Sequence, residues 1–234
     1  LDQGLDPDTD LCGFMLETFQ GWGAIFYPKD FVKKVKEFCI KHDLLLCFDE
    51  MQSGFARTGK MFGYEHYDVI PDLICCGKGM GNGYPISGVL GSAEVMDLPD
   101  VGNMSSTHSA NPLACVIGNA VLHEIEERGL IKESARKGEL LVKELENIKK
   151  EFPERISYIL GKGLIASVIF KDPKTGAPDG KLATKISEKC FKKGLLVVHT
   201  GRESIKIGPP LTISDEAIIE GVQVMKESIK ESIS

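Results

Sequence analysis

Two residues whose side chains can do chemistry follow short apolar runs in the stretch from Leu44 to Gly83. Asp49 follows the run LLLCF, and Lys78 lies between Gly77 and Gly79 after the run LICC. The runs are too short and too evenly apolar for amphipathic helices, so they predict buried strands. Ligands of an open α/β sheet bind beyond the carboxyl ends of its strands. An acid and a lysine at two such ends can therefore face one site.

Ordinary structural explanations exist for the acid and are weaker for the lysine. A carboxylate ending a buried strand needs a cation or hydrogen bonds, and for Asp49 a salt bridge to Arg57 or a helix cap is enough. Lys78 covers no apolar neighbour in its run of glycines. That run lacks the glycine spacing and the Ser or Thr of a Walker loop, and it contains no G-x-G-x-x-G. A phosphate loop is excluded, and a dinucleotide site is disfavoured.

One cofactor uses an acid and a lysine together. Pyridoxal phosphate forms a Schiff base with a lysine, while an acid keeps its pyridine nitrogen protonated. The protonated ring accepts electrons from the α-carbon of an amino acid. A lysine displaced from the cofactor can then carry a proton, provided that its pKa is lowered from about 10.4 by desolvation or a nearby cation.

Composition narrows the class of protein. The sequence has 234 residues, 42% of them hydrophobic, and a net charge of −6, which gives no reason to expect a nucleic acid or an anionic membrane as partner. No apolar run reaches the roughly 20 residues of a membrane helix, and no signal peptide is visible. We expect a soluble, cytoplasmic protein. The seven cysteines show no C-x-x-C spacing, which predicts buried, reduced thiols and no metal.

Hydrophobic periodicity predicts a parallel α/β part followed by a smaller α+β part, with the boundary near Glu126. The first part contains a strand over 11–17, a helix from Pro28 to Ile40, strands over 44–48, 72–76 and 86–90, and a long helix starting at Pro112. The second part contains a helix over 131–152, β-rich segments over 156–169, a loop over 172–180, a helix over 182–191, strands over 195–198 and 204–207, and a helix capped by 214–216.

Five segments carry a resemblance over nearly the whole chain. ETFQGWG, FDEMQSGFARTG, PDLICCGKGMGNGYPISGVLG, SSTHSANPLAC and IKIGPPLTIS follow one another in the order seen in class III aminotransferases, the ω-amino acid, ornithine and 4-aminobutyrate type. The sequence resembles this pyridoxal-phosphate-dependent family of fold type I. The resemblance implies an α/β fold: residues 1–126 form the C-terminal part of the large cofactor-binding domain, with its mainly parallel sheet, and residues 127–234 a small C-terminal α+β domain.

The resemblance also assigns roles to single residues. It implies that Lys78 is the Schiff-base lysine, that Asp49 partners the pyridine nitrogen, that Gln52 bonds the phenolic oxygen and that Met51 packs on the ring. Thr107 resembles the threonine that reaches the cofactor phosphate of a neighbouring subunit. These roles imply a homodimer with active sites at its interface, acting on small amino and keto acids.

Two positions depart from the family pattern. Glu17 stands where the family often has a glutamate that pairs with an arginine binding the substrate carboxylate, but Lys206 occupies the arginine position. Lysine neutralises a carboxylate but lacks the planar two-pronged geometry of arginine. Trp22 stands where a smaller or acidic residue is common, and it narrows the expected pocket. Read without the family pattern, Glu17 is equally well a strand-end acid, Lys206 a surface lysine, and Arg57 a brace for its loop.

The polar start at Leu1, without a methionine, indicates a segment from within a longer protein. Family members place a phosphate-binding loop and a ring-stacking aromatic residue before this point. A protein consisting only of residues 1–234 is expected to bind cofactor weakly and to have no turnover.

Three hypotheses follow. The first is an aminotransferase that moves an amino group from an amine or ω-amino acid to a keto acid by a ping-pong mechanism. The second, on the same scaffold, is a racemase, epimerase or aminomutase. The third is a truncated member without catalysis, which would form no lysine-linked chromophore.

Overall fold

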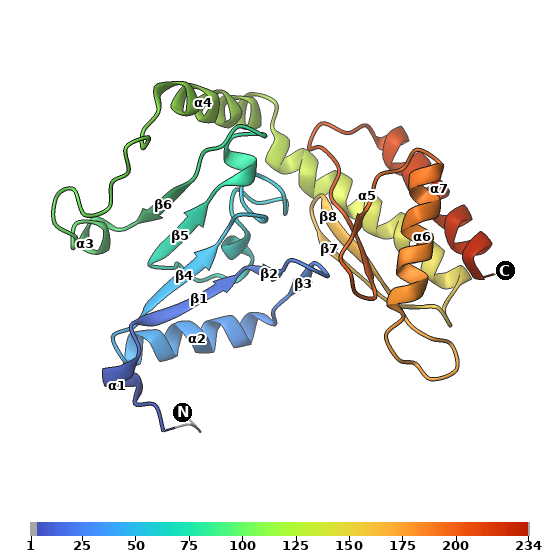
Figure 1. The fold of residues 1–234 in the computed structure, drawn as a ribbon, viewed down its shortest axis with the longest axis horizontal. Helices are drawn as coiled ribbons and strands as arrows, with labels where there is room; N and C mark the ends of the chain where they lie inside the picture. Colours follow the sequence, from blue (N-terminus) through green and yellow to red (C-terminus); the bar gives the residue numbers. More distant parts are fainter. Residues whose placement is uncertain (1–3, 234) are drawn as a thin grey trace. The chain divides into compact units, whose positions relative to one another are not determined.

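A computed structural model describes residues 4–233, which divide into two units (Figure 1). The first, here called the N-terminal unit, comprises the residues up to Phe19 together with Tyr27–Phe55 and Met61–Arg128. The second, the C-terminal unit, comprises Gln20–Phe26, Ala56–Lys60 and Gly129–Ser234. The polypeptide therefore changes unit several times before Gly129.

The N-terminal unit is built on a four-stranded sheet of order β1-β4-β5-β6. Strands β1, β4 and β5 are parallel, and β6 is antiparallel to β5. Their bounds are β1 Gly13–Glu17, β4 Leu45–Asp49, β5 Leu73–Cys76 and β6 Gly88–Gly91. The mainly parallel sheet expected from the apolar runs is present.

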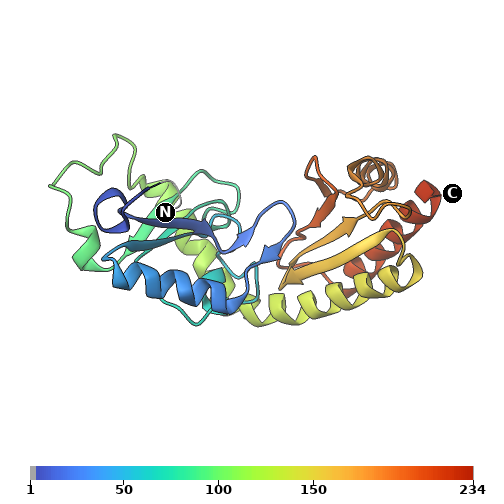
Figure 2. The same cartoon turned by 90° about the horizontal axis from the view of Figure 1, so that it is seen from below.

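Helix α2 (Lys29–Lys41) connects the first two parallel strands of this sheet and runs along one of its faces, as Figure 2 shows. Pro28 is its N-cap, in agreement with the predicted helix start. Alternation in β4 buries Leu46 and Phe48 completely on one face of the sheet. On the other face Met15 in β1 is 63% exposed.

Short elements and one long helix complete the N-terminal unit. Asn111 caps α4 by accepting hydrogen bonds from the backbone N–H groups of Leu113 and Ala114, and Pro112 occupies the first turn as predicted. The elements are α1 Pro7–Asp10, η1 Gly63–His66, η2 Lys78–Met80, α3 Ala93–Met96 and α4 Pro112–Glu127.

The C-terminal unit contains an antiparallel sheet of order β7-β8-β10-β9, three helices, the short strand β3 and the Gln20 end of β2. Gly129, with φ +57°, lies before the first of these helices, where the sequence predicts a break. The elements are β2 Phe19–Gln20, β3 Ile25–Phe26, α5 Leu130–Glu151, β7 Ile156–Lys162, β8 Ile165–Phe170, α6 Gly180–Lys192, β9 Val198–His199, β10 Ser204–Ile207 and α7 Asp215–Ile233.

One hydrophobic core lies between this sheet and its three helices. Leu145 of α5, Ile186 of α6 and Ile229 of α7 are fully buried in it together with Phe170 and Ile205 of the sheet. Every residue of β8 is buried. This strand is therefore covered on both faces, by the core on one and by the Gln20–Phe26 segment on the other.

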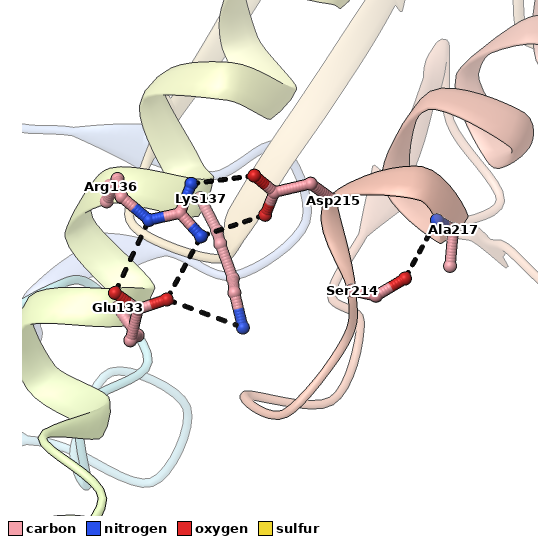
Figure 3. Close-up of polar contacts among 6 residues, drawn as sticks. All are labelled: Glu133, Arg136, Lys137, Ser214, Asp215 and Ala217. Carbon is pink, nitrogen blue, oxygen red and sulfur yellow. Dashed lines mark hydrogen bonds and ion pairs between the residues drawn. The ribbon is translucent and has the colours of Figure 1, made fainter.

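A charged cluster ties α5 to the start of α7 (Figure 3). The guanidinium of Arg136 donates two hydrogen bonds of 2.8 Å to the carboxylate of Asp215 and two more to Glu133. Ser214 accepts the backbone N–H of Ala217 at 3.2 Å, so it caps α7 as the sequence predicts. Bidentate pairing fixes the direction in which α7 begins.

Two sequence expectations are corrected by the structure. The predicted strand over 195–198 is wrong: β9 contains only Val198 and His199, because only these two pair with β10. All seven cysteines are free, but Cys12 and Cys115 are exposed. Cys115 lies on a part of α4 where Val116 is also exposed, so its apolar sequence context did not reveal its exposure.

Within residues 4–233, none of the helices combines the length and the apolar character needed to cross a membrane. The same residues contain no group of three or more metal-ligand side chains.

Candidate active site

The parallel register brings the ends of three strands together at one edge of the sheet. Glu17 pairs with Asp49, and Asp49 pairs with Cys75 on the next strand. Lys78 follows three residues after Cys75. The carboxylate and the lysine predicted to share a site therefore come from adjacent strands, at their carboxyl ends.

Asp49 uses only part of its hydrogen-bonding capacity within residues 4–233. Its Oδ1 accepts the backbone N–H of Met51 at 2.8 Å, and its Oδ2 has no hydrogen bond or ion pair in that range. Arg57, the alternative partner considered from sequence, donates instead to the backbone oxygens of Leu164 at 2.9 Å and Pro209 at 2.6 Å. The reading of Arg57 as a brace is confirmed, and Asp49 keeps an oxygen available for a donor.

Lys78 has an uncommon backbone conformation. Its φ is +42°, in the left-handed region that side chains disfavour. The side chain is exposed, and within residues 4–233 its ammonium has no hydrogen bond or ion pair. Strained residues of this kind persist where the surrounding structure holds them, and they cluster at functional sites.

The glycines beside Lys78 allow the loop after Asp49 to approach closely. The sulfur of Met51 occupies the space that a β-carbon at Gly77 would take, and a β-carbon at Gly79 would lie 3.4 Å from Cβ of Phe55. The loop after β4 therefore packs directly on the backbone that carries Lys78. Sequence patterns could not predict this contact, because it depends on positions 77 and 79 having no side chain.

Gln52 and Glu17 are linked at the same edge. Gln52 donates from Nε2 to Oε1 of Glu17 at 3.2 Å. Both were predicted as site residues, the first for the cofactor and the second for the substrate. Their side chains meet at the ends of neighbouring strands.

Glu50 is a residue that sequence reasoning did not single out. Its carboxylate is completely buried and accepts hydrogen bonds from the hydroxyl of Ser53 and, at 2.8 Å each, from the backbone N–H groups of Gly63 and Tyr64. Burial raises the pKa of Glu50, and these three donors partly offset the rise. The buried carboxylate closes the loop that begins with Met51. The sequence signal that could have identified Glu50 is its position directly after the strand-end acid Asp49.

Thr107 lies in an exposed segment between Gly102 and Asn111. Ser106 and Ser109 bracket it: the backbone N–H of Ser106 donates to Oγ of Ser109 at 3.0 Å, and the two hydroxyls lie 2.9 Å apart. This local turn presents Thr107 and His108 to solvent. In the part of the N-terminal unit that the structure describes, neither side chain makes a polar contact with the strand ends.

Lys206 lies in the C-terminal unit on β10, and its ammonium donates to the carbonyl of Gly21 at 2.9 Å. Two serines make parallel contacts to the same short segment: Ser204 donates to the carbonyl of Trp22 at 2.8 Å, and Ser167 to that of Gly23. Three polar side chains of one sheet face therefore hold three consecutive carbonyls.

The thiol of Cys47 near the strand ends is a poor nucleophile. Sγ of Cys47 and Sγ of Cys75 lie 3.7 Å apart. Burial, followed by the contact with Cys75, raises the pKa of Cys47 to about 12. The thiol of Cys47 therefore stays protonated at neutral pH.

The residues present fit pyridoxal phosphate. Asp49 offers an oxygen for a pyridinium N–H, Lys78 an amine for the aldehyde, and Gln52 an amide for a phenolic oxygen. Asp49 and Lys78 belong to neighbouring strand ends within one unit.

Comparisons with known proteins agree with this reading. The family model of class-III aminotransferases matches residues 5–229. The probable 4-aminobutyrate aminotransferase of Bacillus subtilis is 38% identical over 96% of this chain and 52% of its own length. The leucine/methionine racemase of Thermococcus litoralis is 39% identical over 88% of this chain and 47% of its own.

A solved transaminase structure from the marine bacterium Virgibacillus superposes with a TM-score of 0.89 at 31% identity, covering 99% of this chain and 54% of that one. The chain thus spans about half the length of the relatives it matches. With a matched region that extends over most of its length, the chain belongs to the class-III aminotransferases, a family of α/β enzymes that depend on pyridoxal phosphate.

Proposed function

We propose that the protein containing this chain is an aminotransferase that moves an amino group from an amine or ω-amino acid to a keto acid. The observation that carries the proposal is the placement of Asp49 and Lys78 at adjacent strand ends, with polar atoms of both lacking partners within residues 4–233. Membership of the class-III family supports the same reaction.

Lys78 is proposed as the catalytic residue. When bound, pyridoxal phosphate supplies an aldehyde that condenses with amines and a ring that withdraws electrons from the substrate α-carbon. The Lys78 amine would bind the aldehyde, and when free it would carry a proton to and from the substrate α-carbon. The strained φ of +42° supports a backbone fixed for this role.

Asp49, Gln52 and Met51 are proposed to set the electronic state of the ring. The Oδ2 of Asp49 would hold a proton on the pyridine nitrogen, and Oδ1 accepts the Met51 N–H. Gln52 is proposed to contact the phenolic oxygen from its place beside Glu17, to which its amide donates at 3.2 Å. Met51 would contact the ring.

Glu17 and Lys206 are proposed as substrate-binding residues. Glu17 accepts a bond from Gln52, which gives the cofactor site a direct connection to a substrate-responsive acid. Lys206 supplies positive charge for a carboxylate. Its bond to the Gly21 carbonyl at 2.9 Å fixes the position from which it would do so.

The working form is proposed to be a homodimer, with Thr107 of one subunit reaching the cofactor phosphate of the other. Exposed apolar side chains near Thr107 support a second copy of the chain as partner, since Val101 is fully exposed and Met104 is 80% exposed. Leu113 and Val116 on α4 are exposed as well. The seven free thiols favour a reducing compartment, and we infer the cytoplasm.

A racemase or related isomerase is the second candidate, favoured by the 39% identical relative named as a leucine/methionine racemase. Such enzymes hold the cofactor in the same way and differ in later steps. Omission of the keto acid separates the two candidates. Inversion or migration that continues without any acceptor would remove transamination.

Borohydride reduction of the full-length protein with pyridoxal phosphate tests the proposal. We expect a visible absorption band that reduction abolishes, with the label on the peptide containing Lys78. Lys78→Ala should lose the band, and the matched variant Lys60→Ala should keep it. Label on another lysine would overturn the assignment, and a protein with no lysine-linked chromophore would be a non-catalytic member.

A further inference from the structure

Tyr67 is a buried tyrosine of the N-terminal unit whose hydroxyl makes two backbone hydrogen bonds. It directly follows η1, and its side chain is almost completely inaccessible to solvent. The hydroxyl donates to the carbonyl of Thr18 and accepts the backbone N–H of Tyr27 at 3.2 Å. A phenol has one proton to donate and lone pairs that accept, so both bonds form together. Tyr67 therefore joins the end of β1 to the segment that precedes α2.

The bond to Thr18 restrains the position of Glu17. Thr18 directly follows Glu17, the last residue of β1. The backbone has only two soft dihedral angles per residue, so a carbonyl held at Thr18 limits how far the α-carbon of Glu17 can move. Thr18 is completely buried, and its Oγ1 occupies the space that a β-carbon at Gly63 would take. The residue after Glu17 is thus packed on η1 as well as bonded to Tyr67.

The ring of Tyr67 contacts the neighbouring strand. It stacks on the ring of Phe48, with 6.3 Å between the centroids and 13° between the planes. Phe48 is completely buried and directly precedes Asp49. Ring pairs at this separation attract one another beyond the effect of area burial. One side chain therefore contacts the sequence neighbours of Glu17 and of Asp49, which are register partners.

The hydroxyl of Tyr67 keeps its proton at neutral pH. Burial raises the pKa of Tyr67 to about 12, so the phenol remains a donor to Thr18. Removing the hydroxyl would deprive the Thr18 carbonyl and the Tyr27 N–H of this partner in a region that excludes water. Buried backbone groups that lose a partner favour local rearrangement.

We propose that Tyr67 is a positioning residue for Glu17, an inference that rests on the proposed function, in which Glu17 binds substrate and Gln52 contacts the cofactor. Its hydroxyl fixes the end of β1, and its ring holds β4 through Phe48. The hydrogen bond of 3.2 Å from Gln52 to Glu17 spans these two strand ends. Tyr67 therefore sets the separation that this bond requires.

Amide hydrogen exchange of the full-length protein without cofactor tests the geometry. Tyr67→Phe removes the hydroxyl and keeps the ring. We expect exchange at least about tenfold faster at the Tyr27 amide, which loses its acceptor, and about threefold faster in peptides covering residues 13–19 and 49–53. Helix α2 and strand β5 should keep wild-type rates. A general loss of packing would raise exchange in those elements too.

Tyr64→Phe is the matched control, since it deletes a hydroxyl from the same short segment. Its backbone N–H, which donates to Glu50, is retained. Among residues 4–233 the Tyr64 hydroxyl makes no hydrogen bond. This variant should keep wild-type exchange rates and kinetic constants within about twofold.

Steady-state kinetics and the cofactor spectrum of the full-length holoenzyme test the consequence for the site. Tyr67→Phe should raise KM for the amino and keto acid substrates about three- to tenfold and change kcat less than about twofold, because a displaced Glu17 weakens substrate binding. It should also shift the cofactor absorption band, since Gln52 loses its fixed place beside Glu17.

Several results would overturn the proposal: wild-type exchange at residues 13–19 in Tyr67→Phe, exchange raised equally throughout the N-terminal sheet, or KM values and a band position that do not change. Failure of Tyr67→Phe to fold would assign Tyr67 a general structural role and would count against it equally. The exchange measurement needs no cofactor. Failed labelling of Lys78 would remove the proposed function and leave the exchange result standing, whereas successful labelling beside unchanged Tyr67→Phe kinetics would remove only this inference.

Discussion

Gln52 donates a hydrogen bond from Nε2 to Oε1 of Glu17 across a distance of 3.2 Å, joining the loop after β4 to the end of β1. Glu17 and Asp49 are direct register partners on these two strands. A residue proposed to contact the cofactor and a residue proposed to answer the substrate therefore share one bond. Replacing either side chain is therefore expected to change the position and hydrogen bonding of the other.

A double-mutant cycle measures that coupling. We expect Gln52→Ala and Glu17→Gln to show an interaction free energy of about 0.5–1.5 kcal/mol in unfolding by urea, the usual range for one such bond. In the holoenzyme, Glu17→Gln should also shift the cofactor absorption band if Gln52 donates to the phenolic oxygen. Strict additivity of the two changes, with no spectral shift, would show that the bond does not couple the two groups.

Removing the buried acid Glu50 should be costly. Glu50→Ala leaves the N–H groups of Gly63 and Tyr64 without their acceptor, and each unsatisfied group costs about 1–3 kcal/mol. We expect a loss of at least about 2 kcal/mol in the free energy of unfolding, together with weaker cofactor binding.

Glu65 offers a matched comparison in the same loop. It accepts the backbone N–H of Phe62 at 2.8 Å but does so in an exposed position. Glu65→Ala should cost less than about 1 kcal/mol, because water replaces the lost acceptor. Equal losses of unfolding free energy in the two variants would contradict the conclusion that the buried Glu50 carboxylate stabilises this loop.

Gly77 should not accept a side chain while Met51 is present. A β-carbon at position 77 meets the Met51 sulfur, and overpacking of this kind costs about 1–3 kcal/mol. The φ of −177° at Gly77 is ordinary extended backbone, so the penalty comes from the clash alone. Gly77→Ala should therefore be rescued in part by Met51→Ala. Thermal unfolding of the single and double variants measures this, and a double variant no more stable than Gly77→Ala would exclude the clash as cause.

The hydrogen bonds and ion pairs of Arg136 predict that the stability of the protein depends on pH in the acid range. Hydrogen bonds from Arg136 lower the pKa of both Asp215 and Glu133. A carboxylate with a lowered folded-state pKa contributes stability above its unfolded pKa, about 4 for these residues. That contribution is lost as the pH falls through the folded-state value. Arg136→Ala should therefore lower the melting temperature at pH 7 and flatten its decline below pH 4.

Arg128→Ala is the control for this experiment. Arg128 makes a single exposed contact of 3.3 Å with Glu124, one turn earlier on α4. Its removal should leave the acid dependence nearly unchanged, because such pairs contribute little. An equal flattening by both variants would assign the effect to net charge.

The strand ends could be predicted from sequence because each depends on local pattern. Apolar runs that end in Asp49 and in Cys76 before Gly77 mark parallel strands, and both strands are present, although only Leu46, Phe48 and Cys76 in them are fully buried. The helix beginning at Pro112 and the cap at Ser214 were predictable for the same reason, since each cap is set by residues within one turn. Asp49 and Lys78 follow from these elements.

Features that depend on distant parts of the chain could not be predicted. The Glu50 carboxylate is buried where it accepts hydrogen bonds from the backbone N–H groups of Gly63 and Tyr64. No local sequence pattern predicts that these residues lie beside it. The stack of Arg202 on Trp22 joins residues 180 positions apart in the sequence, counted from their numbers. The extent of β9 depends on pairing with β10, so the apolar run before it was misleading.

The assignment of Gln20–Phe26 to the C-terminal unit has a practical consequence for dissecting the gene. A clone starting at Gly129 would encode the helices and the four-stranded sheet but omit the carbonyls that Ser167 and Ser204 bind. The exposed sheet face of such a fragment would be left with unsatisfied hydroxyls and a bare apolar strand. Supplying residues 20–26 as a synthetic peptide, or grafting them through a circular permutation, is the rational route to a stable excised module.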